Sequence, residues 1–369
     1  MPRVKLGDVA REYKAVNKNS NNLPIVGLEH LTPGDISLEQ WDEGVETTFT
    51  KAFKKGQMLF GRRRAYLKKA ALAPFDGICS GDIIVIEAIP DKINPALLPF
   101  IIQNDLLFDF AVGNSAGSLS PRVKWESLKE YEFELPEIDE QEHLVQLLEA
   151  AHQAKKGYQN LIEATDNLVK SQFIEMFGCA SNCEYLPLEA CCSSVTGGST
   201  PSMKHEEYYG GNVPFIKSGD VKSTYVTSGA LWLTKEALVK TTAKYVPAGS
   251  VIVVIRSGIL KHDLPVAIAQ NPVVINQDLK AFQPKPEFRS QYLAWAIRSN
   301  EEALLRKTRA MTVDNIESKE LFELPVMRAP MDKQMEFESI VEQADKSKFE
   351  LKQAIERIDN LIKSLIQQG

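Results

Sequence analysis

Two stretches of the chain carry apolar residues at a heptad spacing, which is typical of long amphipathic helices. They cover residues 137–178 and 330–369, so each helix would be roughly 50–60 Å long at a rise of ~1.5 Å per residue. So long an apolar strip needs a long partner, and we expect the two helices to pair antiparallel as a coiled coil. The alternative is that each helix packs on its own domain. The apolar positions expected at helix or subunit contacts are Leu144, Leu148, Leu161, Leu168, Ile340, Leu351, Ile358 and Leu361.

Short apolar runs typical of β-strands lie between glycines and prolines and predict strands. These runs are 57–60, 82–86, 250–255 and 272–275. Shorter helices are expected over residues 95–104, 105–112 and 290–306. Strands and helices mixed in this way indicate an α/β (mixed α+β) fold class.

The sequence also contains an internal repeat of long period. Asp166–Ser171 recurs as Asp359–Ser364, 193 positions later, and Phe133–Pro136 recurs as Phe322–Pro325, 189 positions later. Repeats of this kind indicate repeated structural units. We therefore predict two similar domains with pseudo-two-fold symmetry, each followed by its long helix. The predicted boundaries are 1–136 for the first domain, 137–178 for the first helix, 179–329 for the second domain and 330–369 for the second helix.

The composition is that of an ordinary globular chain, with 44% hydrophobic and 25% charged residues in 369 positions. No apolar run reaches ~18 residues and the start lacks an apolar signal core, so we expect neither a membrane helix nor a secretory signal. Five scattered cysteines favour free thiols in a reducing cytoplasm. The alternative is a zinc site built from Cys179, Cys183 and the Cys191–Cys192 pair.

The net charge of −6 is unevenly distributed along the chain. The two helical stretches carry −7 between them, which leaves +1 for the globular parts, and residues 51–75 hold eight Lys and Arg with no Asp or Glu. Such a run indicates contact with phosphate groups of nucleic acid, the alternative being an ordinary solvated face. The candidate DNA-binding residues are Lys54, Lys55, Arg62, Arg63, Arg64, Lys68 and Lys69, followed by Lys204, Lys217, Arg256, Lys261, Arg306 and Arg309.

Motifs of catalysis are missing from the sequence. There is no Walker A loop, no Asn/Asp-Pro-Pro-aromatic motif for a flipped base, and no Gly-x-Gly-x-x-Gly after a strand. The histidines have no metal-ligand spacing. Asp76, Asp82 and Glu87 are the nearest approach to a nuclease site, but no Glu-x-Lys follows them. We therefore expect a binding protein with no catalytic or metal site of its own.

One stretch resembles a known family. Thr196–Ser202, followed by Glu207–Val221, looks like the opening of a target recognition domain in the specificity subunit of type I restriction-modification systems. The first copy lacks the Gly-Gly-x-Thr-Pro part and carries Leu23–Leu31 instead, which resembles another subclass of the same domain. The Phe-Glu-Leu-Pro segment, followed by a glutamine at the start of each long helix, also matches.

The resemblance implies a cytoplasmic protein that reads a bipartite site on double-stranded DNA, one half-site per domain, and positions two methyltransferase (modification) subunits and restriction/translocase subunits on it. It implies no cofactor in this chain, with S-adenosylmethionine, ATP and Mg expected in the partner subunits. The competing class is a coiled-coil interaction scaffold that never touches DNA. The acidic pI and the long helices favour it, and the basic segment 51–75 opposes it.

Overall fold

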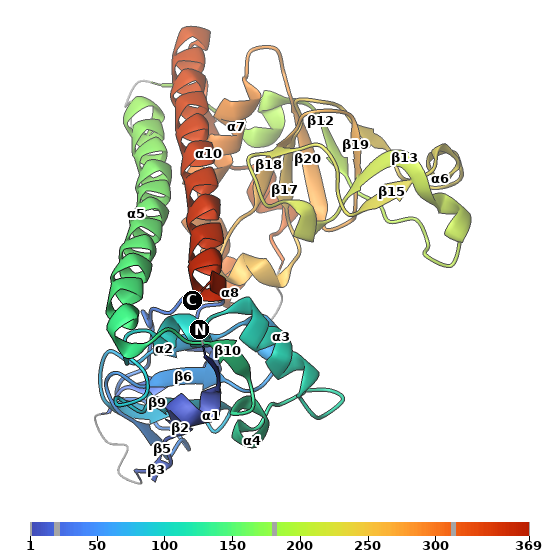
Figure 1. The fold of residues 1–369 in the computed structure, drawn as a ribbon. Coiled ribbons are helices and arrows are strands. Elements are labelled where there is room, and N and C mark those ends of the chain that lie inside the picture. Colours follow the sequence, from blue (N-terminus) through green and yellow to red (C-terminus); the bar gives the residue numbers. More distant parts are fainter. Residues whose placement is uncertain (1, 18–22, 179–182, 311–314, 369) are drawn as a thin grey trace. The chain divides into compact units, whose positions relative to one another are not determined.

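The computed structural model describes residues 2–17, 23–178, 183–310 and 315–368. The chain forms two compact units. Unit 1 comprises Met1–Asn160 and Leu351–Gly369, and unit 2 comprises Leu161–Glu350. Each unit therefore contains a part of both long helices, α5 (Ile138–Phe177) and α10 (Met331–Gln368) (Figure 1). This division differs from the predicted domain boundaries, which give the helices spans of their own and which stay a prediction.

Unit 1 is built on two four-stranded sheets, with strand orders β2-β9-β6-β7 and β3-β5-β8-β4, and on a separate antiparallel pair, β1-β10. Its strands are β1 (Arg3–Lys5), β2 (Ala10–Glu12), β3 (Ala15–Val16), β4 (Ile25–Val26), β5 (Lys51–Phe53), β6 (Met58–Gly61), β7 (Ala70–Leu72), β8 (Gly77–Cys79), β9 (Ile83–Ala88) and β10 (Glu132–Glu134). Its short helices are α1 (Leu6–Val9), η1 (Leu28–His30), η2 (Ala65–Leu67), α2 (Leu98–Ile102), α3 (Asp105–Gly113) and α4 (Trp125–Leu128).

Unit 2 contains a five-stranded sheet, β12-β20-β17-β18-β14, a four-stranded sheet, β15-β13-β19-β16, and the pair β11-β21. Its strands are β11 (Tyr185–Pro187), β12 (Cys192–Gly197), β13 (Tyr209–Ile216), β14 (Tyr225–Val226), β15 (Leu231–Leu233), β16 (Tyr245–Val246), β17 (Val251–Val254), β18 (Val266–Ala269), β19 (Val273–Ile275), β20 (Leu279–Pro284) and β21 (Pro325–Met327). Its short helices are η3 (Leu188–Cys191), η4 (Glu206–Tyr208), η5 (Ser218–Asp220), α6 (Lys235–Lys240), η6 (Gly258–Lys261), α7 (Ser290–Ser299), α8 (Glu301–Ala310) and α9 (Ser318–Phe322).

Two central strands, β6 and β17, lie in predicted runs and are buried along their whole length. All four residues of β6 and all four of β17 are buried, which explains why these runs are continuously apolar and do not alternate. In unit 1 the ring of Phe60 on β6 stacks on that of Phe108 in α3, with ring centroids 5.2 Å apart. The main core of each unit lies among its central sheet, its short helices and buried residues of the long helices.

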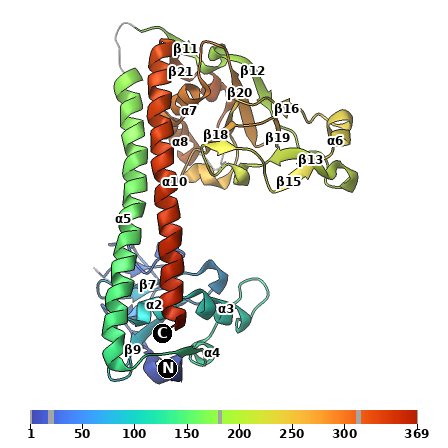
Figure 2. The same cartoon turned by 45° about the horizontal axis from the view of Figure 1, so that its top comes forward.

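The two units share one topology, which confirms the prediction of two similar copies. The strand order β2-β9-β6-β7 in unit 1 corresponds to β12-β20-β17-β18 in unit 2. The second sheet of each unit also contains a parallel pair, in which Ile25 lies opposite Ile78 and Phe215 lies opposite Val274. Unit 2 adds β15 and α6, and within this unit Figures 1 and 2 place α6 and β13 at the end remote from α7.

The long helices pair with each other inside both units. In unit 2, Lys348 lies 2.8 Å from Asp166 and the ring of Phe337 lies 5.2 Å from that of Phe173, so α10 runs antiparallel to α5. In unit 1, Ile362 near the end of α10 packs against the core that contains Leu148 of α5. The prediction of an antiparallel pair is confirmed, and the alternative that each helix packs only on its own domain is wrong. No helix in the described ranges combines the length and apolarity that a membrane span requires.

A buried glutamine fixes the start of each long helix. Gln141 donates from Nε2 to the carbonyl of Pro136 at 2.9 Å and accepts at Oε1 from the backbone N–H of Asn94 at 2.7 Å. Gln334 makes the same contacts. Its Nε2 donates to the carbonyl of Ala329 at 2.8 Å, and its Oε1 accepts from the backbone N–H of Arg289 at 2.8 Å. Buried amides need such partners, which is a physical reason for the glutamine that the sequence repeats.

Candidate nucleic-acid interface

The basic segment 51–75 forms β5, β6, η2 and β7 of unit 1, and folding gives half of its cations a carboxylate partner. Lys51 lies 3.4 Å from Glu12, and Lys54 lies 2.8 Å from Asp76. Arg63 lies 3.5 Å from Asp82, and Lys68 lies 2.5 Å from Asp105. The absence of Asp and Glu from residues 51–75 therefore does not leave all of its cations unpaired, because carboxylates from outside the segment pair with four of them.

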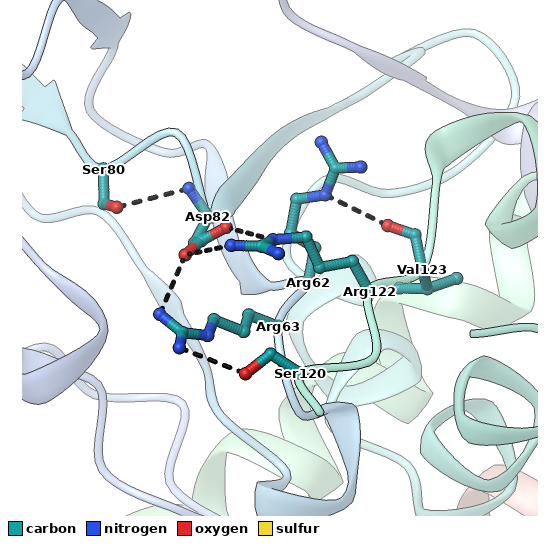
Figure 3. A network of polar contacts seen from close by, with 7 residues as sticks. All are labelled: Arg62, Arg63, Ser80, Asp82, Ser120, Arg122 and Val123. Atoms are coloured by element: carbon teal, nitrogen blue, oxygen red, sulfur yellow. Dashed lines mark hydrogen bonds and ion pairs between the residues drawn. The ribbon is translucent and has the colours of Figure 1, made fainter. Parts of the chain in front are cut away.

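Arg62 and Arg63 belong to a polar network around Asp82 (Figure 3). Arg122 donates from Nε to Asp82 Oδ1 at 2.7 Å and from Nη2 to Oδ2 at 3.3 Å, while Arg63 Nη1 lies 3.5 Å from Oδ2. Arg63 also donates from Nη2 to Ser120 Oγ at 3.1 Å, and Arg62 donates from Nε to the carbonyl of Val123 at 3.1 Å. The hydrogen bond from Arg122 is the largest cause that lowers the pKa of Asp82 below its usual value. These arginines are therefore held in fixed positions.

The next five residues form a tight turn around η2 with an unusual backbone. Arg64 and Lys68 have φ values of 54° and 53°, a left-handed conformation that costs a non-glycine residue on the order of 1–3 kcal/mol. The turn is held by hydrogen bonds from Arg64 N–H to Pro121 O at 2.9 Å and from Gly34 N–H to Lys68 O at 3.0 Å. Tyr66 is 54% exposed on it. The fold therefore keeps a strained turn that presents an aromatic side chain to solvent.

The other cations of this segment differ in their freedom. Lys69 donates a hydrogen bond from Nζ to the carbonyl of Leu28 at 2.6 Å. Lys68 shares its partner Asp105 with Lys363, which lies 2.8 Å from that carboxylate. Lys55 and Arg64 are exposed, and among the described residues neither has a side-chain partner. These two cations keep their full hydrogen-bonding capacity for an external anion.

The predicted residues of unit 2 differ in their exposure. Lys204, Lys261 and Arg306 are exposed and Lys217 is half-buried. Arg256 lies 4.0 Å from Asp278, an arrangement that repeats Arg63 and Asp82 of unit 1. The side chain of Arg309 lies outside the described residues. The DNA-binding assignments of the whole set stay a prediction.

The candidate subunit contacts on the long helices fall into three groups. Leu148 is fully buried in the core of unit 1 and has no surface to offer a partner. Leu161, Leu168 and Leu361 are 52%, 58% and 51% exposed. The half-buried ones are Leu144, Ile340, Leu351 and Ile358. Only the exposed group presents apolar side chains for a partner chain to cover.

The described residues contain no group of His, Cys, Asp and Glu arranged to hold a metal ion. Cys79, Cys183, Cys191 and Cys192 are free, and Cys179 of the considered zinc set lies outside the described residues. The three carboxylates weighed as a nuclease site are separately engaged. Asp76 pairs with Lys54, Asp82 pairs with Arg122, and Glu87 pairs with Arg11 at 2.5 Å.

The Thr196–Ser202 segment, which carries the family resemblance, packs closely on the turn between β19 and β20. A Cβ atom added to Gly198 would clash with the backbone oxygens of Asn276 and Ile275. Ser199 N–H donates to Ile275 O at 3.0 Å, and Thr200 Oγ1 donates to the side chain of Gln277. The second glycine of this motif is therefore required for close backbone contact.

Sequence reasoning missed Asp82 as the centre of the arginine network, and it missed Arg122 and Tyr66. Asp82 was considered only as a nuclease carboxylate. The repeat held the missing signal, because Arg63 and Asp82 correspond to Arg256 and Asp278 at offsets of 193 and 196. Pairs that recur together in both copies indicate a shared structural contact.

Residues 3–164 and 188–359 each match the family described as the type I restriction modification DNA specificity domain. The chain is 35% identical over 153 residues to the Escherichia coli type I restriction enzyme EcoR124I/EcoR124II specificity subunit, covering 41% of this chain and 37% of that protein. It is 33% identical over 108 residues to the Methanocaldococcus jannaschii MjaIX specificity subunit, covering 28% of this chain and 24% of that protein. The matched segments thus span well under two thirds of these relatives.

Similar folds occur among solved structures. One solved structure is described as showing the structural basis of complex assembly and conformational transition of the type I R-M system. It has a TM-score of 0.55 and 19% identity, covering 99% of this chain and 96% of that one. The type I restriction-modification S subunit from M. genitalium has a TM-score of 0.51 and 13% identity, covering 99% and 96%. These likenesses concern the fold. With both of its units matched by the family, the chain belongs to the type I restriction modification DNA specificity domain family.

Proposed function

We propose that this chain is the DNA-reading specificity subunit of a type I restriction-modification complex. Each unit recognises one half of a bipartite site on double-stranded DNA, and the chain itself catalyses no step. The observation that carries the proposal is that both units match the DNA specificity domain family and share one topology. Two related readers in one chain suit a target with two half-sites.

Contacts to DNA would be of two kinds, those that add affinity and those that select the base sequence. Exposed cations such as Lys55 and Arg64 supply phosphate contacts, which fix position and add affinity. Side chains that reach base edges in a groove supply the choice.

The complex would also need partner proteins. Modification (methyltransferase) and restriction/translocase subunits carry the chemistry, with S-adenosylmethionine, ATP and Mg bound there. The exposed leucines Leu161, Leu168 and Leu361 are among the apolar residues of the long helices that a modification subunit would cover. The competing scaffold function, without DNA contact, is not favoured, because residues 3–164 and 188–359 match the DNA specificity domain family.

The decisive experiment measures binding of the chain, with and without its co-expressed methyltransferase partner, to a pool of random duplexes at two salt concentrations. We expect selection of a split sequence and a steep decrease of affinity with salt, because bound cations release counterions from DNA. In a second arm, residues 185–325 are replaced by the corresponding residues of a relative. This chimera should change only one half of the selected sequence. A chain that selects no duplex, or a chimera that changes both halves, would overturn the proposal.

A further inference from the structure

Both units contain the same turn after the central strand of the main sheet. In unit 1, Arg62 N–H donates to Asp82 O at 2.9 Å and Val123 N–H donates to Arg62 O at 3.0 Å. In unit 2, Ile255 N–H donates to Asp278 O at 2.9 Å and Ile316 N–H donates to Ile255 O at 2.9 Å. The backbone of each turn is therefore fixed from both sides in the same way.

The residue that follows is an arginine in both units, and it faces the aspartate of the same neighbouring strand connection. Arg63 lies 3.5 Å from Asp82, and Arg256 lies 4.0 Å from Asp278. Each arginine also sits in an antiparallel bridge, Arg63 with Arg122 and Arg256 with Asn315. We name each Arg–Asp pair the brace of its turn. Both copies contain this pair, in addition to the equivalent backbone hydrogen bonds.

The residues that the turns display differ between the copies. Unit 1 shows Arg64 and Tyr66 where unit 2 has Ser257 and Ile259. Tyr66 is 54% exposed and Ile259 is 41% exposed, although both are large side chains in turns held by backbone hydrogen bonds. Packing within its own unit therefore does not explain why a large residue occupies either position. Two domains that recognise different half-sites require this combination, in which the same backbone support carries different exposed residues.

We propose that the turns Arg64–Lys68 and Ser257–Lys261 enter a groove of the duplex, with Tyr66 and Ile259 as specificity-determining residues, one for each half-site. This rests on the proposed function. An apolar or aromatic side chain reads a base pair by its fit to the thymine methyl group, and the tyrosine hydroxyl adds a donor and an acceptor. Arg63–Asp82 and Arg256–Asp278 are positioning pairs, because a reader needs a rigid support to discriminate between bases.

The first test compares Tyr66→Ala and Ile259→Ala in the full chain with its methyltransferase partner, using selection from the random duplex pool. We expect Tyr66→Ala to lose about tenfold of the preference at one or two base pairs of one half-site, and Ile259→Ala to do the same in the other half. Val16→Ala is the matched control, an apolar residue of unit 1 that is 69% exposed. It should change nothing.

The second test concerns the brace. Asp82→Asn removes the charge that holds Arg63 and should relax the preference at the first half-site while the second stays intact, whereas Asp82→Glu should restore much of it. Glu130→Gln is the control, since Glu130 pairs with Lys5, which is not a candidate DNA contact. Asp278→Asn should give the converse result. It also keeps the test valid if Asp82→Asn does not fold.

The outcomes separate this proposal from the function on which it rests. If wild-type protein selects a split site and Tyr66→Ala and Ile259→Ala both leave it unchanged, or each changes both halves, the turns are not the readers. Asp82→Asn weakening both half-sites equally would show a general structural role for the brace. Wild-type protein that selects no sequence would overturn the proposed function itself.

Discussion

The ammonium group of Lys155 in α5 donates a hydrogen bond of 2.6 Å to the carboxylate of Asp359 in α10. The same contact occurs in unit 2 with the partners exchanged between the helices, since Lys348 in α10 lies 2.8 Å from Asp166 in α5. Both lysines and both aspartates are related by the 193-residue offset of the repeat. The internal repeat therefore includes the contact between the helices as well as the residues themselves.

The Lys155–Asp359 pair should contribute measurably to stability. Lys155 is only 19% exposed at its side chain, so we expect a coupling of about 1 kcal/mol, at the upper end for surface ion pairs. Urea unfolding of wild type, Lys155→Met, Asp359→Asn and the double variant gives this number. Additive effects of the two substitutions would contradict it.

Gly198 should tolerate no side chain. Gly198→Ala forces a Cβ atom against the backbone oxygens of Asn276 and Ile275, and backbone atoms cannot rotate away. We expect a loss of about 2–3 kcal/mol in the free energy of unfolding. Gly197→Ala is the control, because the nearest atom to its added Cβ is Lys280 Nζ at 3.9 Å. Equal melting temperatures for the two variants would contradict the expectation.

His152 should make unit 1 less stable in mild acid. Burial is the main cause that lowers the pKa of His152, with Lys155 and Lys156 acting in the same direction and Asp35 opposing them. The folded state therefore favours the neutral ring. Its contribution is complete above the unfolded pKa of about 6.5 and is lost as the pH falls below that value. Between pH 7.5 and 5.5, wild type should lose more stability in urea unfolding than His152→Gln. Equal losses would refute this.

The buried thiols should be inert in the folded protein. Burial raises the pKa of Cys79 and Cys192 to about 12 and that of Cys191 to about 11, so little reactive thiolate is present at pH 8. Of the described cysteines, iodoacetamide should modify the half-buried Cys183 first. Mass spectrometry of the native protein, with a urea-unfolded sample as the control, tests this order. Rapid native labelling of Cys79 would contradict it.

The arginine triplet should separate into structural and binding roles. Arg62→Ala loses the hydrogen bond to the Val123 carbonyl and should cost about 1 kcal/mol of stability. Arg64→Ala should leave the melting temperature unchanged, lower the affinity for duplex DNA, and reduce the salt slope by about 1 if its side chain contacts one phosphate. Thermal unfolding and duplex titration at several salt concentrations measure both effects. An unchanged salt slope for Arg64→Ala would remove Arg64 from the interface.

The sequence by itself determined the elements that depend on neighbours along the chain. Heptad spacing predicts both long helices, short apolar runs predict β6 and β17, and the repeat of Asp166–Ser171 predicts two similar copies. It also placed the acidic charge on the helices. These signals are local or periodic, so they can be recognised before any contact between distant residues is known.

Only the tertiary structure decided which side chains are buried and which charges are free. Val169 is buried and its neighbour Leu168 is 58% exposed, although both are apolar and lie in one heptad pattern. Asp82 pairs with Arg63 and with Arg122, which is 40 residues away, and this removes Arg63 from the free cations and leaves Arg64. Burial and ion pairing depend on groups that folding brings from distant parts of the sequence, and a charge count over a window of the chain does not include them.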